Sequence, residues 1–248
     1  FRFHKMTKTV TTLVLIFCTF AAVVGQQQRL DAAIDLYHLF DRSNSIGAIL
    51  YRRHIMFAQG ISDRFGNLTG YYDELTNGNG IRVTSMGFGC RGNKDKSIFF
   101  TDKAGNYEAI KAGLDDAYER VPNLKETCLI PSFEKVETRL NATKNLDPER
   151  KSLVLVYTDG ESGDFGTDYI KDNPILRNPN VKVFAIGTGP NSKLDRLAFI
   201  TGNPNTTYSG PAPRFQDELF EDSLPFATAS ADYSIVEREG KTPISQAC

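Results

Sequence analysis

The sequence predicts an α/β protein with a doubly wound, mostly parallel central sheet and helices on both faces. Short apolar runs that suit buried strands alternate with segments whose apolar residues recur at helical spacing. Right-handed crossovers through the helices would bring successive strands into one parallel sheet. Two of the apolar runs end at a carboxylate, Asp41 and Asp159. In such sheets, ligands bind at the carboxyl ends of the strands.

The first strand is predicted over residues 35–41, a mostly apolar run that stops on Asp41. Ser43 and Ser45 follow at alternate positions, and helical spacing begins at Ile46. Alternation along an extended loop turns these three oxygen-bearing side chains the same way, which suits a hard divalent cation such as magnesium, calcium or manganese. The alternative is that one of them only caps the helix.

A glycine-rich stretch in the middle of the chain has the sequence pattern of a nucleotide-binding motif. Residues 66–80 are predicted as a loop and residues 81–86 as the second strand, after which residues 87–92 match the spelling G-x-G-x-x-G. That motif needs a helix to open at its last glycine, so that a pyrophosphate meets the helix amino end. Residues 97–100 instead indicate a short strand. We therefore interpret the stretch as a hairpin and reject a nucleotide site.

The remaining segments continue the alternation. Strands are predicted over residues 152–158 and 181–186 and near Tyr208, and helices over residues 106–121, 133–140, 194–198 and 215–220. Residues 123–132 form the loop before the second of these helices. The strand over residues 152–158 is apolar and rich in β-branched residues, and it ends at Asp159 and Gly160. A second carboxylate is thus expected at the ligand-binding edge.

The amino-terminal residues have the form of a secretory signal peptide. Lys5 and Lys8 precede an apolar run over residues 10–24, which closes with small residues. That run is shorter than the roughly 20 residues a membrane span needs. We expect residues 1–25 to be leader and signal, residues 26–32 a short segment, residues 33–226 one domain and residues 227–248 a polar tail.

Charge and sequons fit a secreted protein. The chain carries 29 basic and 30 acidic residues, so it lacks the basic surplus of a nucleic-acid-binding surface. Asn67, Asn141 and Asn205 each open an N-x-S/T triplet and are candidate glycosylation sites.

Three cysteines remain after the predicted signal, namely Cys90, Cys128 and Cys248. An odd number in an oxidising compartment implies one pair and one unpaired thiol. We favour Cys90–Cys128 as the pair, with Cys248 free to link two chains. Two alternatives stay open: Cys248 pairs with Cys90, or Cys90 and Cys128 are small apolar core residues.

Three motifs resemble the von Willebrand factor type A domain family. Residues 35–47 are similar to its opening D-I-V-F-L-L-D-G-S-G-S-V-G, residues 153–162 to its fourth strand and T-D-G-x-S turn, and residues 181–189 to its V-x-V-F-A-I-G-x-G strand. They occur in the family's order and at its separations, and the resemblance covers about residues 33–226.

The resemblance implies a metal-ion-dependent adhesion site of five oxygen ligands. Asp41, Ser43, Ser45 and Asp159 match four of them. The fifth is a threonine, for which the best alignment gives Thr127. Thr101 is the rival, but it precedes the earlier helix and would leave residues 123–132 without a role.

The loop also departs from the family pattern at two positions. Arg42 and Asn44 replace small residues between the ligands. We expect both side chains to point outward, with Arg42 adding positive charge beside the ion.

The implied function is adhesion rather than catalysis. A magnesium ion, or manganese or calcium in its place, would bind an acidic side chain of an extracellular protein, with collagen as one candidate. A single such domain behind a signal peptide also resembles invertebrate matrix proteins of the byssal-thread and shell kind. The alternative is a structural matrix domain, assembled by disulfides, whose metal site is vestigial. Enzymatic activity is not expected, because His38 lies in a strand and His54 in a helix.

Overall fold

The structure is a computed structural model that describes residues 30–72, 78–92, 94–120, 122–143, 150–160, 172–187, 192, 194–209 and 212–228. The predicted signal peptide and Cys248 lie outside these residues, as does most of the predicted tail. Within them, six strands form one sheet in the order β3-β2-β1-β4-β5-β6. The strands are β1 (Ala33–Asp41), β2 (Gly80–Phe88), β3 (Ile98–Ala104), β4 (Lys151–Tyr157), β5 (Val181–Gly187) and β6 (Thr207–Ser209).

All neighbouring strands run parallel except β2 and β3, which pair antiparallel. The predicted doubly wound, mostly parallel sheet is therefore confirmed. The β2–β3 pair is the predicted hairpin, so the glycines of residues 87–92 do not open a helix. β1 lies at the centre, with β2 on one side and β4 on the other.

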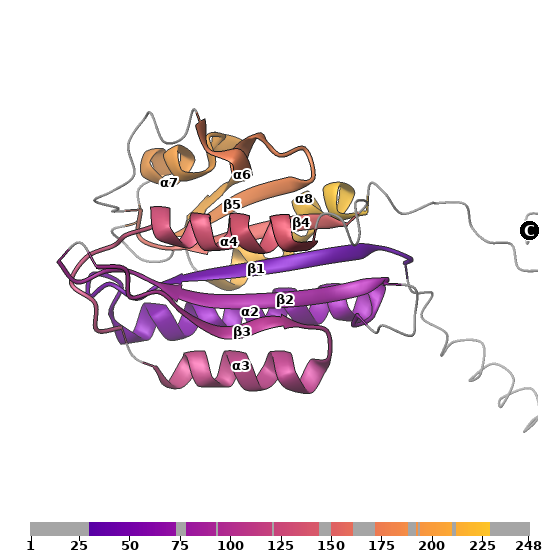
Figure 1. Ribbon diagram of the computed structural model, residues 1–248, viewed down its shortest axis with the longest axis horizontal. Coiled ribbons are helices and arrows are strands. Elements are labelled where there is room, and N and C mark those ends of the chain that lie inside the picture. Colours follow the sequence, from indigo (N-terminus) through magenta and orange to yellow (C-terminus); the bar gives the residue numbers. More distant parts are fainter. Residues whose placement is uncertain are drawn as a thin grey trace, which may run out of the picture.

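Helices cover both faces of the sheet (Figure 1). They are α2 (Gly47–Thr69), α3 (Tyr107–Glu119), α4 (Ile130–Thr143), α6 (Pro174–Arg177), α7 (Leu194–Thr201) and α8 (Ala212–Ala227), with a short 3-10 helix at Pro204–Thr206. One face packs against α2, α3 and α8, and the other against α4, α6 and α7.

The alternation of side chains along β1 assigns each residue to a face. Ile34, Leu36 and Phe40 belong to the core under α2, α3 and α8, whereas Tyr37 and Leu39 belong to the core under α4, α6 and α7. Each fully buried apolar side chain of this size contributes about 1.5–3 kcal/mol. Burial on both faces explains why the strand lacks a polar side.

Helix boundaries are the main departure from the predictions. The first helix continues through Gly66 to Thr69, where a loop was predicted, and Gly70 ends it with a φ of 82°. A Cβ at Gly66 would stand 2.5 Å from the ring of Tyr71. Glycine is thus tolerated inside this helix because the tyrosine packs on its backbone.

Two later helices also begin before the predicted residue. α4 starts at Ile130 rather than Phe133, and Pro131 suits its first turn because proline lacks the N–H that would be unpaired there. α8 runs over Ala212–Ala227, well beyond residues 215–220. The short α6 and the 3-10 helix were not predicted.

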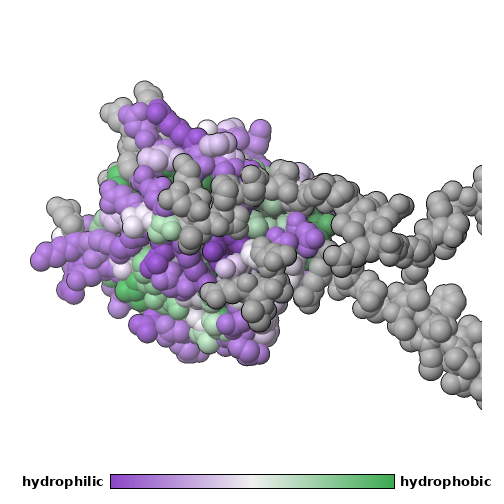
Figure 2. Space-filling view, turned by 45° about the vertical axis from the view of Figure 1, so that its right-hand side comes forward, coloured by the Kyte–Doolittle hydropathy of each residue, from purple (hydrophilic) through white to green (hydrophobic). Residues whose placement is uncertain are grey.

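Few large apolar side chains among the described residues are exposed. Figure 2 shows one face on which hydrophilic residues predominate and apolar residues form small groups. None of the described helices has the length and apolar character needed to cross a membrane. The sequon residues Asn67, Asn141 and Asn205 are all exposed.

Two histidines are buried in the core and give the fold a dependence on pH. His38 shares hydrogen bonds with the Tyr157 hydroxyl at 3.0 Å and the Ser62 hydroxyl at 2.9 Å. Burial lowers the pKa of His38 to about 3, and that of His54 likewise. In the unfolded chain each pKa returns to about 6.5, so the unfolded state takes up protons first as the pH falls.

We therefore expect acid to destabilise the fold through these histidines. Each one should remove about 2 kcal/mol of unfolding free energy between pH 6.5 and pH 5, since one proton per pH unit corresponds to about 1.4 kcal/mol. Urea unfolding of wild type and His38→Gln at both pH values tests this. The stability difference between the two proteins should shift by about 2 kcal/mol in favour of the variant at the lower pH, and a constant difference would contradict the prediction.

Candidate metal centre

Asp41 ends β1 at the point where the strand order reverses. β1 pairs with β2 on one side and with β4 on the other, and both pairs are parallel. Such a reversal leaves a crevice at the carboxyl ends of the strands, the general ligand position of open α/β sheets. The side chain of Asp41 is fully buried there. The register of β1 against β4 ends at the Phe40–Tyr157 pair, and the residues that follow, Asp41 and Thr158, are joined by a side-chain hydrogen bond.

Hydrogen-bond donors from three loops converge on the Asp41 carboxylate. The Ser43 backbone N–H donates to Oδ1 at 2.8 Å, and the Thr158 hydroxyl donates to Oδ2 at 2.7 Å. The Thr127 hydroxyl donates to Oδ2 at 3.2 Å. The hydroxyls of Ser43 and Ser45 lie 2.9 Å apart. The loop after β1, residues 42–45, is called the ligand loop below. It holds its side-chain oxygen atoms close to one another.

The electrostatics of Asp41 suit a bound cation. Burial raises the pKa of Asp41 to about 6, the nearby charge of Asp159 raises it too, and hydrogen bonds from Ser43 and Thr158 oppose the rise. No basic side chain among the described residues forms an ion pair with Asp41. A divalent ion would offset the cost of holding this carboxylate charged and buried. The donor set, carboxylates and hydroxyls only, is the one that hard cations prefer.

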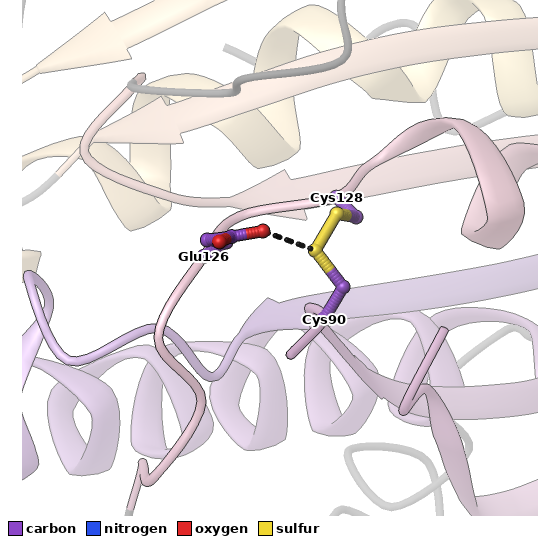
Figure 3. Close-up of side chains that lie close together, drawn as sticks. All are labelled: Cys90, Glu126 and Cys128. Atoms are coloured by element: carbon purple, nitrogen blue, oxygen red, sulfur yellow. Dashed lines mark hydrogen bonds between the residues drawn. A yellow bond between two sulfur atoms is a disulfide. The ribbon is translucent and has the colours of Figure 1, made fainter. Parts of the chain in front are cut away.

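The loop that carries Thr127 is attached to its neighbours on two sides. Backbone bonds join Leu124 to the ligand loop, from Leu124 N–H to Arg42 O at 3.1 Å and from Asn44 N–H to Leu124 O at 2.8 Å. Cys90, two residues after β2, pairs with Glu126 through a bond of 2.9 Å from Cys90 N–H to Glu126 O. A disulfide joins Cys90 to Cys128 (Figure 3). The favoured cysteine pair is therefore present, and the pairing of Cys90 with Cys248 is not.

The two candidate threonines occupy different places. Thr101 lies in β3, where its hydroxyl accepts a hydrogen bond of 2.8 Å from the Ser85 hydroxyl. Thr127 lies against Asp41. The structure thus brings together the predicted Asp41, Ser43, Ser45 and Thr127, with Asp159 close enough to influence the pKa of Asp41.

The expectation for Arg42 was wrong. Its side chain does not point outward but is buried, with a 3.4 Å hydrogen bond from Nη2 to the Asn123 side-chain oxygen. Its stem lies against Gly87, where a Cβ would stand 2.3 Å from Arg42 Cδ. Strand alternation turns Arg42 to the same side as Phe40, and the absence of a side chain at Gly87 leaves room for it. Asn44 is exposed, as expected.

Thr158 was not among the predicted site residues, although the strand–Thr–Asp–Gly turn that contains it was singled out. The register of β1 against β4 would have predicted that Thr158 lies next to Asp41. Neither described histidine lies in the site: both are core residues packed near Tyr157.

A family model for the von Willebrand factor type A domain matches residues 35–222. The chain belongs to this family. A search of curated proteins found no match to the chain. The family assignment agrees with the position of Asp41 at the switch point of the sheet.

Solved structures of this domain type resemble the chain. Proximal thread matrix protein 1 from the mussel byssus, in a structure with a zinc-occupied MIDAS motif, gives a TM-score of 0.58 at 17% identity, covering 79% of this chain and 46% of that chain. Manganese-loaded TRAP protein from Plasmodium vivax gives 0.59 at 21% identity, covering 80% and 74%. A second crystal form of the byssus protein gives 0.57 at 19% identity, covering 77% and 46%. The chain thus spans less than half the length of the byssus protein.

Proposed function

We propose that this von Willebrand factor type A domain is an extracellular adhesion or matrix module that binds a protein partner through a divalent ion. The proposed ligands are Asp41, Ser43, Ser45, Thr127 and Asp159. The observation that carries the proposal is the fully buried Asp41 carboxylate, surrounded by hydroxyls from three loops and near a second carboxylate. Thr158 would orient the Asp41 carboxylate through the hydrogen bond that its hydroxyl donates to Oδ2.

The ion would supply positive charge and open coordination positions for a carboxylate of the partner. The chain's own residues hold that ion at the surface end of a rigid sheet, so the partner meets a preorganised site. Magnesium is our first choice because it prefers oxygen ligands and retains exchangeable waters. Zinc in the byssus protein and manganese in TRAP support a divalent ion in general.

An exposed apolar residue adjoins the proposed site. Ile49 is 72% exposed and lies in the first turn of α2, directly after the ligand loop. If a partner segment extends from the ion over the first turn of α2, burial of this isoleucine would contribute about 1.5–3 kcal/mol. The combination of an ion and a neighbouring apolar contact favours a protein partner over a small anion.

Secretion, glycosylation and a dimer through Cys248 remain parts of this proposal. The predicted signal peptide and Cys248 lie outside the described residues. The exposed sequon residues Asn67, Asn141 and Asn205 could each accept a glycan without disturbing the core. The second candidate function, a structural matrix domain with a vestigial metal site, is favoured only by the predicted unpaired Cys248.

Partner binding should depend on the ion. With the chain immobilised, we expect proteins of an extracellular-matrix extract, with fibrillar collagen as the first purified probe, to bind in magnesium or manganese and to dissociate in chelator. The same surface carrying Asp41→Ala is the control and should bind nothing in either buffer. Binding that is equal in chelator and in magnesium would support the structural alternative.

A further inference from the structure

The position of Thr127 depends on attachments at both ends of a loop that contains no regular helix or strand. Upstream, Leu124 bonds to the ligand loop through the backbone of Arg42 and Asn44. Downstream, Glu126 pairs with Cys90 in an antiparallel bridge, with N···O distances of 2.9 and 3.3 Å. Both of these backbone attachments precede Thr127, whereas Cys128 and the start of α4 follow it.

The disulfide is the covalent part of the downstream attachment. It links Cys128, the residue after Thr127, to Cys90, two residues beyond the end of β2, with a Cα–Cα distance of 5.5 Å. Cys90 is fully buried. The bond therefore ties the Thr127 backbone to the rigid sheet that also carries Asp41. Figure 3 shows the disulfide beside Glu126.

We propose that the Cys90–Cys128 disulfide is a redox-controlled positioning device that holds Thr127 against Asp41, so that reduction weakens metal binding while the domain stays folded. The inference rests on the proposed metal-dependent function and adds its regulation. After reduction, the backbone bridges at Leu124 and Glu126, both of which precede Thr127, and the Thr127–Asp41 hydrogen bond would remain, but no covalent bond would hold the segment that follows the threonine. The core should survive reduction, because neither cysteine belongs to the two apolar clusters that pack on the faces of the sheet and Cys90 lies beyond the end of β2.

The environment of the disulfide favours a defined reduction. Cys90 is fully buried whereas Cys128 is partly exposed, so a thiolate of an external dithiol would attack the Cys128 sulfur. The Cys90 thiolate leaves and takes up a proton. The second thiol of the dithiol then displaces Cys128 as a thiol, and the reagent closes into its own disulfide. Two electrons and two protons pass to the protein.

Glu126 would stabilise the reduced form. Its Oε2 lies 3.5 Å from Cys90 Sγ. In the disulfide that sulfur carries no hydrogen, so the contact is not a hydrogen bond. In the thiol form Cys90 could donate its hydrogen to this carboxylate. The potential ligand atoms of Cys90, Glu126 and Cys128 lie within 4.8 Å of one another, so reduced protein should be tested with manganese, which prefers oxygen, rather than with zinc, which prefers thiolates.

The test compares manganese affinity in oxidised and reduced protein. Calorimetry is performed on oxidised wild type, on wild type reduced with a dithiol and freed of reagent under nitrogen, and on Cys90→Ser/Cys128→Ser. Cys248→Ser, which keeps the disulfide, is the matched control. We expect reduced wild type and the double variant to bind manganese about 10- to 100-fold more weakly, the effect typical of losing a residue that orients a metal ligand. Reoxidation of wild type should restore the affinity.

Circular dichroism of the same samples separates positioning from folding. Near-ultraviolet spectra that stay native in the reduced protein, together with weaker binding, support the proposal. Equal affinity in oxidised and reduced wild type would overturn it, as would loss of the native spectrum on reduction. Absence of manganese binding by oxidised wild type would instead refute the proposed function itself. If the double variant fails to fold, the reversible change in wild type alone decides.

Discussion

Asp41→Ala is expected to abolish magnesium and manganese binding while the domain stays folded. The variant removes one of the two proposed charged ligands and the acceptor of the hydrogen bonds from Ser43, Thr127 and Thr158. Loss of a residue that only orients a ligand already weakens metal binding about 10- to 100-fold, so loss of this carboxylate should exceed about 100-fold. Isothermal calorimetry of metal binding measures the change.

The fold should tolerate this substitution. A buried carboxylate whose pKa is raised by burial is costly to keep ionised without a cation. Its removal relieves that cost but leaves the donors of Ser43, Thr127 and Thr158 without this acceptor. The two effects oppose each other, so we expect only a small change in the unfolding free energy of the metal-free protein. Unchanged metal affinity in a folded Asp41→Ala protein would eliminate the proposed ligand set.

Two threonine variants provide matched controls for the same measurement. Thr127 and Thr101 are buried to the same degree, with 7% and 6% of the residue exposed. Thr127→Ala should weaken metal binding and Thr101→Ala should not, because Thr101 bonds to Ser85 in β3. The reverse order would mean that the loop of Thr127 has been aligned incorrectly.

The alternation of strands and helices was predictable because the strands β1, β2, β4 and β5 are buried on both faces. Burial of this kind leaves long apolar runs, such as residues 35–41 and 152–158, which are hard to mistake. Helix ends were less predictable, since they depend on tertiary contacts. Tyr71 packs on the backbone of Gly66 inside α2, and no local pattern reveals that contact.

The candidate site could be predicted to the extent that its residues form contiguous motifs. Asp41, Ser43 and Ser45 stand in one loop, and Asp159 follows a recognisable strand. The orientation of Arg42 was not predictable from its position between ligands, because it depends on the space left by Gly87 in another strand. Thr158 likewise required the register between β1 and β4.

The largest effect on stability is expected at the opposite end of the sheet, for Asp35→Ala. Asp35 and Arg82 are register partners in β1 and β2, and the guanidinium donates to both carboxylate oxygens at 2.7 and 2.8 Å. Arg150 adds a bond of 3.3 Å to Asp35 and donates to Ile34 O and Gly80 O at 3.0 Å each. Both guanidinium groups lie over the ring of Tyr72 at 5.2 Å.

Removal of Asp35 would take away the carboxylate that accepts hydrogen bonds from the buried Arg82 and Arg150. Breaking a buried ion pair from one side typically costs 3–5 kcal/mol, because an uncompensated charge remains away from water. We expect Asp35→Ala to lose about this much unfolding free energy in urea denaturation. The control is Asp172→Ala, which breaks an ion pair with Arg177 whose side chains are 63% and 80% exposed and should cost less than about 1 kcal/mol. Equal effects of the two variants would mean that water reaches Arg82 and Arg150 in the folded protein.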